Sequence, residues 1–196
     1  MGWLRFIPSL SAFLSQKNII RILDDLLPQH KIEKSKIALD IIATDAASGK
    51  DFVFSKGSIK TAVCAAMAYP GIFRPLKYKN RYLIDGGITN CIPADVCRKK
   101  LGKKSVVVSI KLESPYRKRW EPKNYIQILA RSVTLSFGKQ RFRMMEEYSD
   151  FVLEPLKKER FAHTNLNFLN TKRLEHYYRL GKKEGQRYIR RIKEKL

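Results

Sequence analysis

The chain has 196 residues, enough for one ordinary domain, and 44% of them are hydrophobic, so a packed core is expected rather than disorder. Its longest apolar run, residues 62–69, is far shorter than the roughly 20 residues that span a membrane. Forty lysine and arginine residues against 18 acidic residues give a net charge of +22, which predicts attraction to polyanions. Collagen, mucin and coiled-coil proteins do not fit this composition.

Nucleic acid and anionic lipid are the two polyanions that such a charge would attract. The sequence contains no RNP-type run, no zinc-finger spacing and no phosphate-binding loop, so no specific nucleic-acid partner is expected. The three cysteines, Cys64, Cys91 and Cys97, form no C-x-x-C pair, which argues against a disulfide framework and a zinc site. Arg5 interrupts the apolar start of the chain, so we expect no signal peptide and a cytoplasmic location.

Apolar periodicity, turn residues and helix caps predict the secondary structure in chain order. The first half is expected to contain a helix over residues 18–27 that ends at Pro28, strands over residues 36–44 and 51–55, a helix with Ser58 as its N-cap that ends at residues 69–71, and a strand over residues 81–84. The second half is expected to contain a helix over residues 93–100, a strand over residues 104–110, a helix from Pro122, a strand over residues 151–153 and a basic helix from Thr171.

Strands that alternate with helices predict an α/β fold in which a mostly parallel sheet is flanked by helices. In such sheets, functional groups lie at the carboxyl ends of strands. Asp85 ends one predicted strand, and Gly86 and Gly87 follow it, which allows a sharp turn and the close approach of another segment. Asp-Gly pairs also occur in ordinary turns, so this spacing leaves Asp85 open as a base, a metal ligand or a turn residue.

Several further motifs follow one another along the chain. They are I-A-T-D at residues 42–45, S-G-K at 48–50, F-S-K-G at 54–57, A-V-C-A-A-M-A-Y-P-G-I-F-R-P at 62–75, Y-L-I-D-G-G-I-T-N at 82–90 with Pro93, V-V-V at 106–108 and D-F-V-L-E-P at 150–155. In this order they resemble the patatin-like phospholipase family over nearly the whole chain. The resemblance implies a partial patatin-like three-layer sandwich with a mostly parallel sheet.

Members of that family are serine acyl hydrolases that use a Ser–Asp dyad. The resemblance implies that Asp85 is the general base, that Gly86 and Gly87 shape the site, and that the substrate is a lipid acyl ester cleaved without a metal or a cofactor. A carboxylate needs a dry site, direct hydrogen-bond reach and an oxyanion hole to activate a serine. Leu83, Ile84, Ile88 and residues 70–73 are the expected apolar surround.

The family's serine lies in a G-x-S-x-G elbow upstream of the aspartate. Neither this elbow nor the glycine-rich oxyanion segment occurs in the chain. We therefore expect residues 1–196 to form a single, N-terminally incomplete patatin-like domain that is inactive alone. The loss of the first strands predicts an exposed sheet edge with apolar core surface.

Other nucleophiles in the chain are weaker candidates. Ser55-Lys56-Gly57 follows a strand and precedes a helix as an elbow does, but Val53 occupies the position of the first elbow glycine, so Ser55 is expected to be a loop hydroxyl. The remaining candidates are expected to be ordinary structural residues: Ser136 in a helix, His30, His163 and His176 in scattered positions, and Cys64 and Cys91 as small buried side chains.

The basic C-terminal helix, residues 172–195, carries ten basic residues against three acidic ones and has an apolar side. Such a helix can lie on an anionic membrane, whereas a packing helix with a solvated basic face is the commoner explanation. The sequence therefore predicts a cytoplasmic lipid acyl hydrolase, peripheral to the membrane. The alternative is a non-catalytic basic scaffold that binds anionic membrane surfaces.

Overall fold

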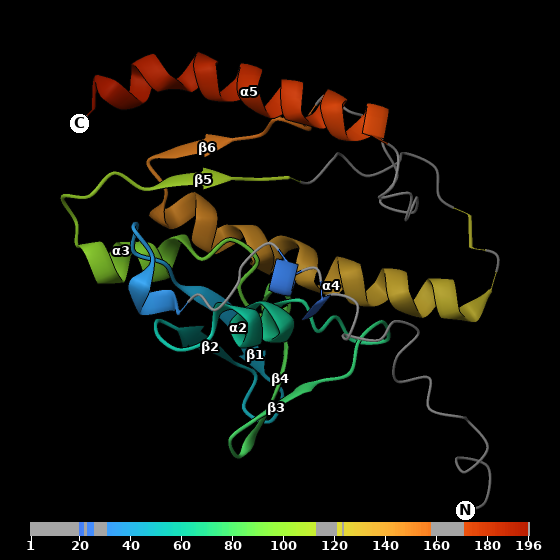
Figure 1. Ribbon diagram of the computed structural model, residues 1–196. Helices are drawn as coiled ribbons and strands as arrows, with labels where there is room; N and C mark the ends of the chain where they lie inside the picture. Colours follow the sequence, from blue (N-terminus) through green and yellow to red (C-terminus); the bar gives the residue numbers. More distant parts are fainter. Residues whose placement is uncertain are drawn as a thin grey trace, which may run out of the picture. The chain divides into compact units, whose positions relative to one another are not determined.

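A computed structural model describes residues 20–21, 23–25, 31–112, 121–122, 124–157 and 171–195 of the chain. The chain divides into two compact units, Met1–Cys91 and Ile92–Leu196. The first unit contains a four-stranded sheet and the second a two-stranded sheet (Figure 1). Residues 20–21 and 23–25 are helical, as predicted, whereas the expected end of that helix at Pro28 lies outside the described residues.

The four-stranded sheet is antiparallel throughout and has the strand order β2-β1-β4-β3. Its strands are β1 (Ile41–Asp45), β2 (Lys50–Phe54), β3 (Leu76–Tyr78) and β4 (Arg81–Asp85). The predicted three-layer sandwich with a mostly parallel sheet is therefore wrong. Residues 46–49 join β1 to β2 and residues 79–80 join β3 to β4, and these turns are far too short for the crossover that parallel strands need.

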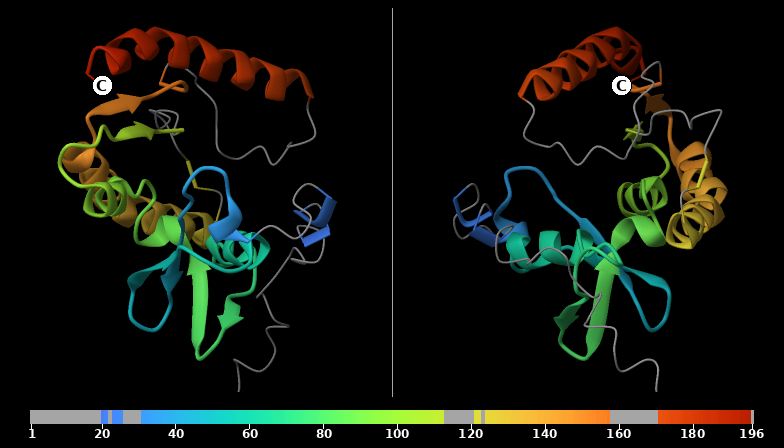
Figure 2. Two further views of the ribbon diagram at one scale, coloured as in Figure 1. Left: turned by 60° about the vertical axis from the view of Figure 1, so that its left-hand side comes forward. Right: turned by 90° about the vertical axis from the view of Figure 1, so that its right-hand side faces the viewer.

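Two hairpins thus lie next to each other, because β1 also pairs with β4. Asp45 is opposite Leu83 and Ala43 is opposite Asp85, so both hairpin turns are at one end of the sheet and Asp85 is toward the other (Figure 2). The prediction for residues 51–55 matches β2 within one residue, whereas residues 36–40, expected in the first strand, precede β1.

One helix, α2 (Ile59–Ala66), covers this sheet. It begins as predicted at Ser58, whose hydroxyl accepts a hydrogen bond from the Thr61 amide over 3.3 Å. Its inner face is made of small residues, which lets the helix lie close to the strands. The buried core comprises Ile32, Ala43, Phe54, Ile59, Ala62, Ala65 and Leu83. Ile32 enters this core from the short 3-10 helix η2 (Ile32–Lys34).

Aromatic side chains from both edge strands meet over the same face. The ring of Phe54 on β2 lies 4.8 Å from that of Phe52 and 5.2 Å from that of Tyr78 on β3, in edge-to-face geometry. Phe52 and Tyr78 are both packed against the buried core cluster of the first unit. Edge-to-face pairs add to the burial energy of the rings, so this cluster helps to hold both hairpins in one sheet.

The second unit alternates helices and short strands. It contains α3 (Ala94–Leu101), β5 (Val108–Ile110), α4 (Tyr125–Tyr148), β6 (Phe151–Leu153) and α5 (Thr171–Lys193). The two strands are parallel, as predicted for this part of the chain, with Val108 opposite Phe151. The long helix α4 connects them; its N-cap is Asn124, two residues after the predicted start at Pro122.

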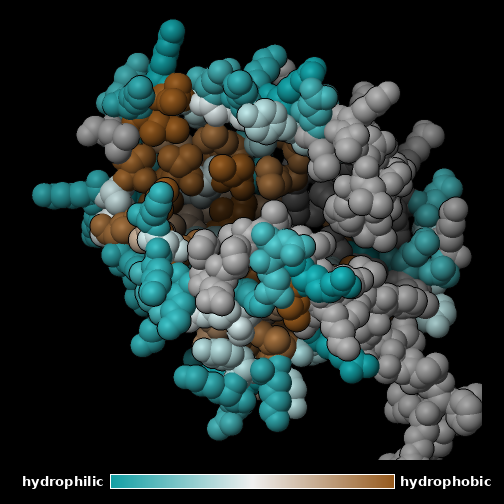
Figure 3. Space-filling model, in the orientation of Figure 1, coloured by the Kyte–Doolittle hydropathy of each residue, from teal (hydrophilic) through white to brown (hydrophobic). Residues whose placement is uncertain are grey.

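The strand expected over residues 104–110 is confined to β5, which lies at an edge of its two-stranded sheet within the described residues. Its side chains alternate: Val108 and Ile110 are 38% and 56% exposed, and Ser109 between them is only 4% exposed. Leu112 continues the exposed row. Hydrophobic residues gather at the position of β5 and β6 in Figure 3. Among the described residues, β5 thus has an open strand edge and exposed apolar side chains, whereas the link of such an edge to missing strands stays a prediction.

Candidate active site

Asp85 is the last residue of β4, and its backbone is held from two sides. Its amide donates to the carbonyl of Ala68, two residues after α2, over 3.1 Å. Its carbonyl accepts a hydrogen bond from the Thr44 hydroxyl on β1 over 2.9 Å. Because register partners share a face, Asp85 lies on the same face as Ala43, the face that α2 covers. The end of β4 is therefore fixed in the first unit.

The turn after Asp85 depends on its two glycines. The short 3-10 helix η3 (Gly86–Ile88) begins here, and the Asp85 carboxylate accepts a hydrogen bond from the Gly87 amide over 2.7 Å. A Cβ on Gly86 would overlap the Ile42 carbonyl and lie 2.8 Å from its carbon. The close approach expected at this glycine is therefore to β1, and the Gly87 amide sets the direction of the carboxylate.

Polar residues that sequence reasoning did not single out hold the loop beyond the glycines. The buried Thr44 hydroxyl is 2.9 Å from the Thr89 hydroxyl. The Asn90 amide donates to the Gly86 carbonyl over 2.9 Å, and the Asn90 side chain donates to Asp51 on β2 over 2.8 Å. Thr44 and Asn90 belong to the recognised motifs, but their partners come from other strands, so no signal in the sequence gave their roles.

Only some of the apolar residues expected around Asp85 are buried. Leu83 is completely buried, whereas Ile84 and Ile88 are half-buried and residues 70–71 are exposed. Asp85 itself is half-buried. The carboxylate is thus oriented by hydrogen bonds and retains some access to solvent in this chain.

Ser55 does not reach Asp85. It is exposed and follows β2, two strands away from β4. Phe54 is opposite Ile41 and Asp85 is opposite Ala43, so Ser55 lies beyond the end of β2 and out of register with Asp85.

The other candidates occupy the positions expected for structural residues. Cys64 is buried in α2, and this burial raises the pKa of its thiol, which suppresses the thiolate. Cys91 is half-buried, Ser136 is in α4, and His176 is exposed on α5 beside the ring of Tyr177. His30 and His163 lie outside the described residues.

Asp45, the last residue of the I-A-T-D motif, has a separate structural role at the opposite end of β1. Its carboxylate accepts a hydrogen bond from the Ala47 amide over 3.0 Å and forms an ion pair with Arg81. The Ala47 amide, and then the Arg81 guanidinium, lower the pKa of this carboxyl. Asp45 therefore remains charged and fixes the β1–β2 turn rather than joining Asp85.

Among the residues that the structure describes, no group of three or more histidine, cysteine or acidic side chains is placed to hold a metal ion. No helix in this part of the chain combines the length and the apolar character needed to cross a bilayer.

Comparison with known proteins bears on the segment that contains Asp85. The family model of the patatin-like phospholipases matches residues 2–98. These residues resemble a patatin-like phospholipase domain. The patatin-like segment includes the Asp85-Gly86-Gly87 turn, Thr44 and Asn90, whereas the later motifs at residues 106–108 and 150–155 lie beyond the match. The resemblance expected over nearly the whole chain is thus supported for its first half.

Curated relatives match a segment of similar length at low identity. An uncharacterised NTE family protein of Mycobacterium tuberculosis is 34% identical over 88 residues, which make up 44% of this chain and 24% of that relative. A protein of Mycobacterium bovis with the same description matches equally. A further NTE family protein of M. tuberculosis is 26% identical over 87 residues and is matched over 15% of its length. The chain therefore matches a quarter or less of the length of these relatives.

Proposed function

We propose that this chain supplies the general base, Asp85, of a patatin-like lipid acyl hydrolase that works through a Ser–Asp dyad. The observation that carries the proposal is the fixed Asp85-Gly86-Gly87 turn within the segment that matches the patatin-like family. The Gly87 amide orients the carboxylate, and the Thr44 hydroxyl fixes the backbone carbonyl of the same residue, which is the positioning that a weak carboxylate base needs. The proposed substrate class is an acyl ester of a phospholipid or a related lipid.

In the proposed reaction, Asp85 takes the proton of a serine hydroxyl as the serine oxygen attacks the ester carbonyl. The proton then passes to the departing alcohol oxygen, which leaves an acyl-serine ester. Water, deprotonated by the same carboxylate, attacks this ester, releases the fatty acid and restores the serine. In this second half of the reaction the proton taken from water passes from Asp85 to the serine oxygen. Each half of the reaction therefore returns Asp85 to its charged form, and no cofactor is consumed.

The serine of the proposed dyad would come from residues outside this chain, because no G-x-S-x-G elbow occurs in its 196 residues and Ser55 lies two strands away from Asp85 and out of register with it.

The first experiment is to sequence the DNA upstream of the Met1 codon in all three frames. An encoded G-x-S-x-G elbow would provide the partner of Asp85, and the longer product could then be expressed. We expect it to hydrolyse p-nitrophenyl esters and to release fatty acid from phospholipid vesicles. Asp85→Asn should lower the rate by about a hundredfold or more. Asp95→Asn on α3 is the matched control and should retain the rate.

The 196-residue chain provides the complementary measurement. We expect neither ester turnover nor labelling of a serine by a fluorophosphonate probe. Turnover by this chain that survives Asp85→Asn would overturn the proposal, as would a longer product that is indifferent to the same change. Non-coding DNA upstream would favour the alternative, a non-catalytic scaffold.

A further inference from the structure

The two sides of α5 have different environments. The half-buried side chains Tyr177, Leu180, Glu184, Tyr188 and Ile192 recur every three or four residues, so they form one side of the helix. α5 packs against β6 in the second unit. This inner side is accordingly the part of the helix that the fold uses for packing.

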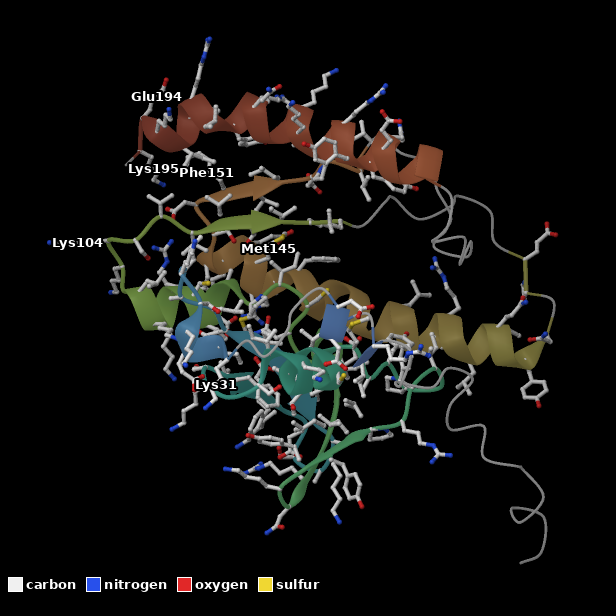
Figure 4. The ribbon with its side chains drawn as sticks, viewed as in Figure 1. Lys31, Lys104, Met145, Phe151, Glu194 and Lys195 are labelled. Carbon is white, nitrogen blue, oxygen red and sulfur yellow. The ribbon has the colours of Figure 1, made fainter. Side chains whose placement is uncertain are left out.

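The end of α5 is fixed to the start of β6. Lys195, just after the helix, donates a hydrogen bond to Asp150 over 2.7 Å and lies 5.5 Å from the centre of the Phe151 ring. Arg191 lies 6.0 Å from the centre of the same ring. Figure 4 shows Lys195 and Phe151 close together beside the end of the helix. These contacts fix which side of α5 faces β6. The residues on the opposite, outer side can therefore be identified.

The outer side is strongly basic. Besides Arg191, which lies beside the Phe151 ring, six lysine and arginine residues of α5 are exposed: Arg179, Lys182, Lys183, Arg187, Arg190 and Lys193. Arg179 pairs with Glu175 and Arg187 pairs with Glu184 on the same helix. Lys182, Lys183, Arg190 and Lys193 have no ion pair within the residues that the structure describes. Nitrogen-tipped side chains extend from α5 away from β6 in Figure 4.

Two large apolar side chains share this outer side. Tyr178 and Ile189 are 70% and 50% exposed, whereas the other described apolar side chains of this helix are half-buried. They are three turns apart, about 16 Å along the axis. Lys182 and Lys193 each follow one of them by four residues, so apolar and cationic groups alternate along one stripe.

We propose that the outer face of α5, defined as Tyr178, Lys182, Lys183, Ile189, Arg190 and Lys193, binds an anionic membrane surface. The cations contact lipid phosphates, while the Tyr178 ring and the Ile189 side chain enter the boundary between headgroups and acyl chains. The charge of this face is complementary to an anionic leaflet, and each lysine or arginine near such a leaflet contributes separately.

The apolar residues distinguish a membrane from nucleic acid. A phosphate backbone would attract the same cations through counterion release, but an exposed isoleucine would add no binding free energy. At a lipid surface both kinds of group contribute to binding, because Ile189 and Tyr178 are buried as the cations approach. The membrane is therefore the partner that accounts for the whole outer face of α5. This proposal does not depend on Asp85 or on catalysis.

The test is co-sedimentation of the 196-residue chain with vesicles of phosphatidylcholine alone and of equimolar phosphatidylcholine and phosphatidylglycerol. We expect binding to the anionic vesicles that weakens at high salt. The double variant Lys182→Gln, Arg190→Gln should bind about 25-fold more weakly, since each cation near the surface accounts for about fivefold. The control Lys99→Gln, Lys104→Gln removes the same charge from exposed residues outside α5 and should bind as the wild type does.

A variant of the apolar residue Ile189 provides the second part of the test. Ile189→Ser should weaken vesicle binding by about tenfold, because less apolar surface is buried, and circular dichroism should confirm that α5 remains helical. Equal binding to neutral vesicles would overturn the proposal, as would equal losses in the two double variants. Vesicle binding that is insensitive to Ile189→Ser and is displaced completely by duplex DNA would instead indicate a nucleic-acid surface and would also overturn it.

Discussion

Arg98 on α3 and Asp150, just before β6, form an ion pair with 2.6 Å between the Arg98 Nη2 and Asp150 Oδ2 atoms. The same carboxylate accepts hydrogen bonds from the Val107 amide and from Lys195. One acidic side chain therefore connects α3, the residue before β5, and the end of α5. Both members of the pair are largely buried, which makes its loss costly.

Asp150→Asn should lower the free energy of unfolding by about 2 kcal/mol at neutral pH, because the neutral amide faces two cations. Lys195, the Val107 amide and Arg98 hold the pKa of Asp150 far below its usual range. Because this pKa is lower in the folded state, the stabilisation is complete above about pH 4 and disappears as the pH falls through the folded pKa. Urea unfolding of both proteins over this range measures the difference. A difference that persisted unchanged at low pH would contradict this explanation.

Gly86→Ala should destabilise the first unit by about 1–3 kcal/mol, because its methyl group would overlap the Ile42 carbonyl and push β4 away from β1. Gly181→Ala is the control: nothing lies within 4 Å of a Cβ at this helical position, so that change should raise stability by up to about 1 kcal/mol. Thermal unfolding of the three proteins compares them. Equal melting temperatures for Gly86→Ala and the wild type would show that a methyl group at residue 86 fits beside the Ile42 carbonyl.

Ile110→Lys should reduce aggregation without a loss of stability, because Ile110 projects from the open edge strand β5. Ser109→Lys, one residue earlier, should destabilise the second unit, since Ser109 is buried and hydrogen-bonded to Ser149. Light scattering and chemical unfolding separate the two effects. If Ile110→Lys proved the more destabilising change, the alternation of β5 would be the reverse of that described.

Ser58→Ala should cost about 1 kcal/mol, because the hydroxyl that caps α2 is lost and the Thr61 amide is left without this partner. Ser55→Ala, at an exposed position three residues earlier, should have almost no effect on stability. Urea unfolding of both variants measures the difference. An equal loss of unfolding free energy in the two variants would show that the Ser58 hydroxyl does not stabilise α2 as a cap.

Local signals predicted the helices and strands well. The Ser58 cap, the Pro93 start of α3 and the β-branched run before Ile110 all identify elements that the structure contains. Pairing was predicted less well. The alternation of strand and helix suggested crossovers, but the turn at residues 46–49 and the undetected strand β3 form hairpins instead. Strand direction depends on which segments meet in space, and apolar periodicity does not encode that.

The same distinction applies to the candidate site. Asp85 and its glycines stand out in the sequence because an acid before two glycines is a recognisable motif, and the family match includes them. The groups that orient the turn, Thr44 and Asn90, become visible only through contacts between strands. Sequence patterns reveal neighbours along the chain, whereas these hydrogen bonds join residues about forty positions apart.

β4 has Asp85 at one end and the exposed two-residue turn at residues 79–80 at the other. Arg81, the first residue of this strand, is four residues from Asp85, which corresponds to about 13 Å. A short epitope inserted between Lys79 and Asn80 would therefore project from the far end of the hairpin. The protein could be immobilised or detected through that attachment point while the carboxylate and its hydrogen bonds are left untouched.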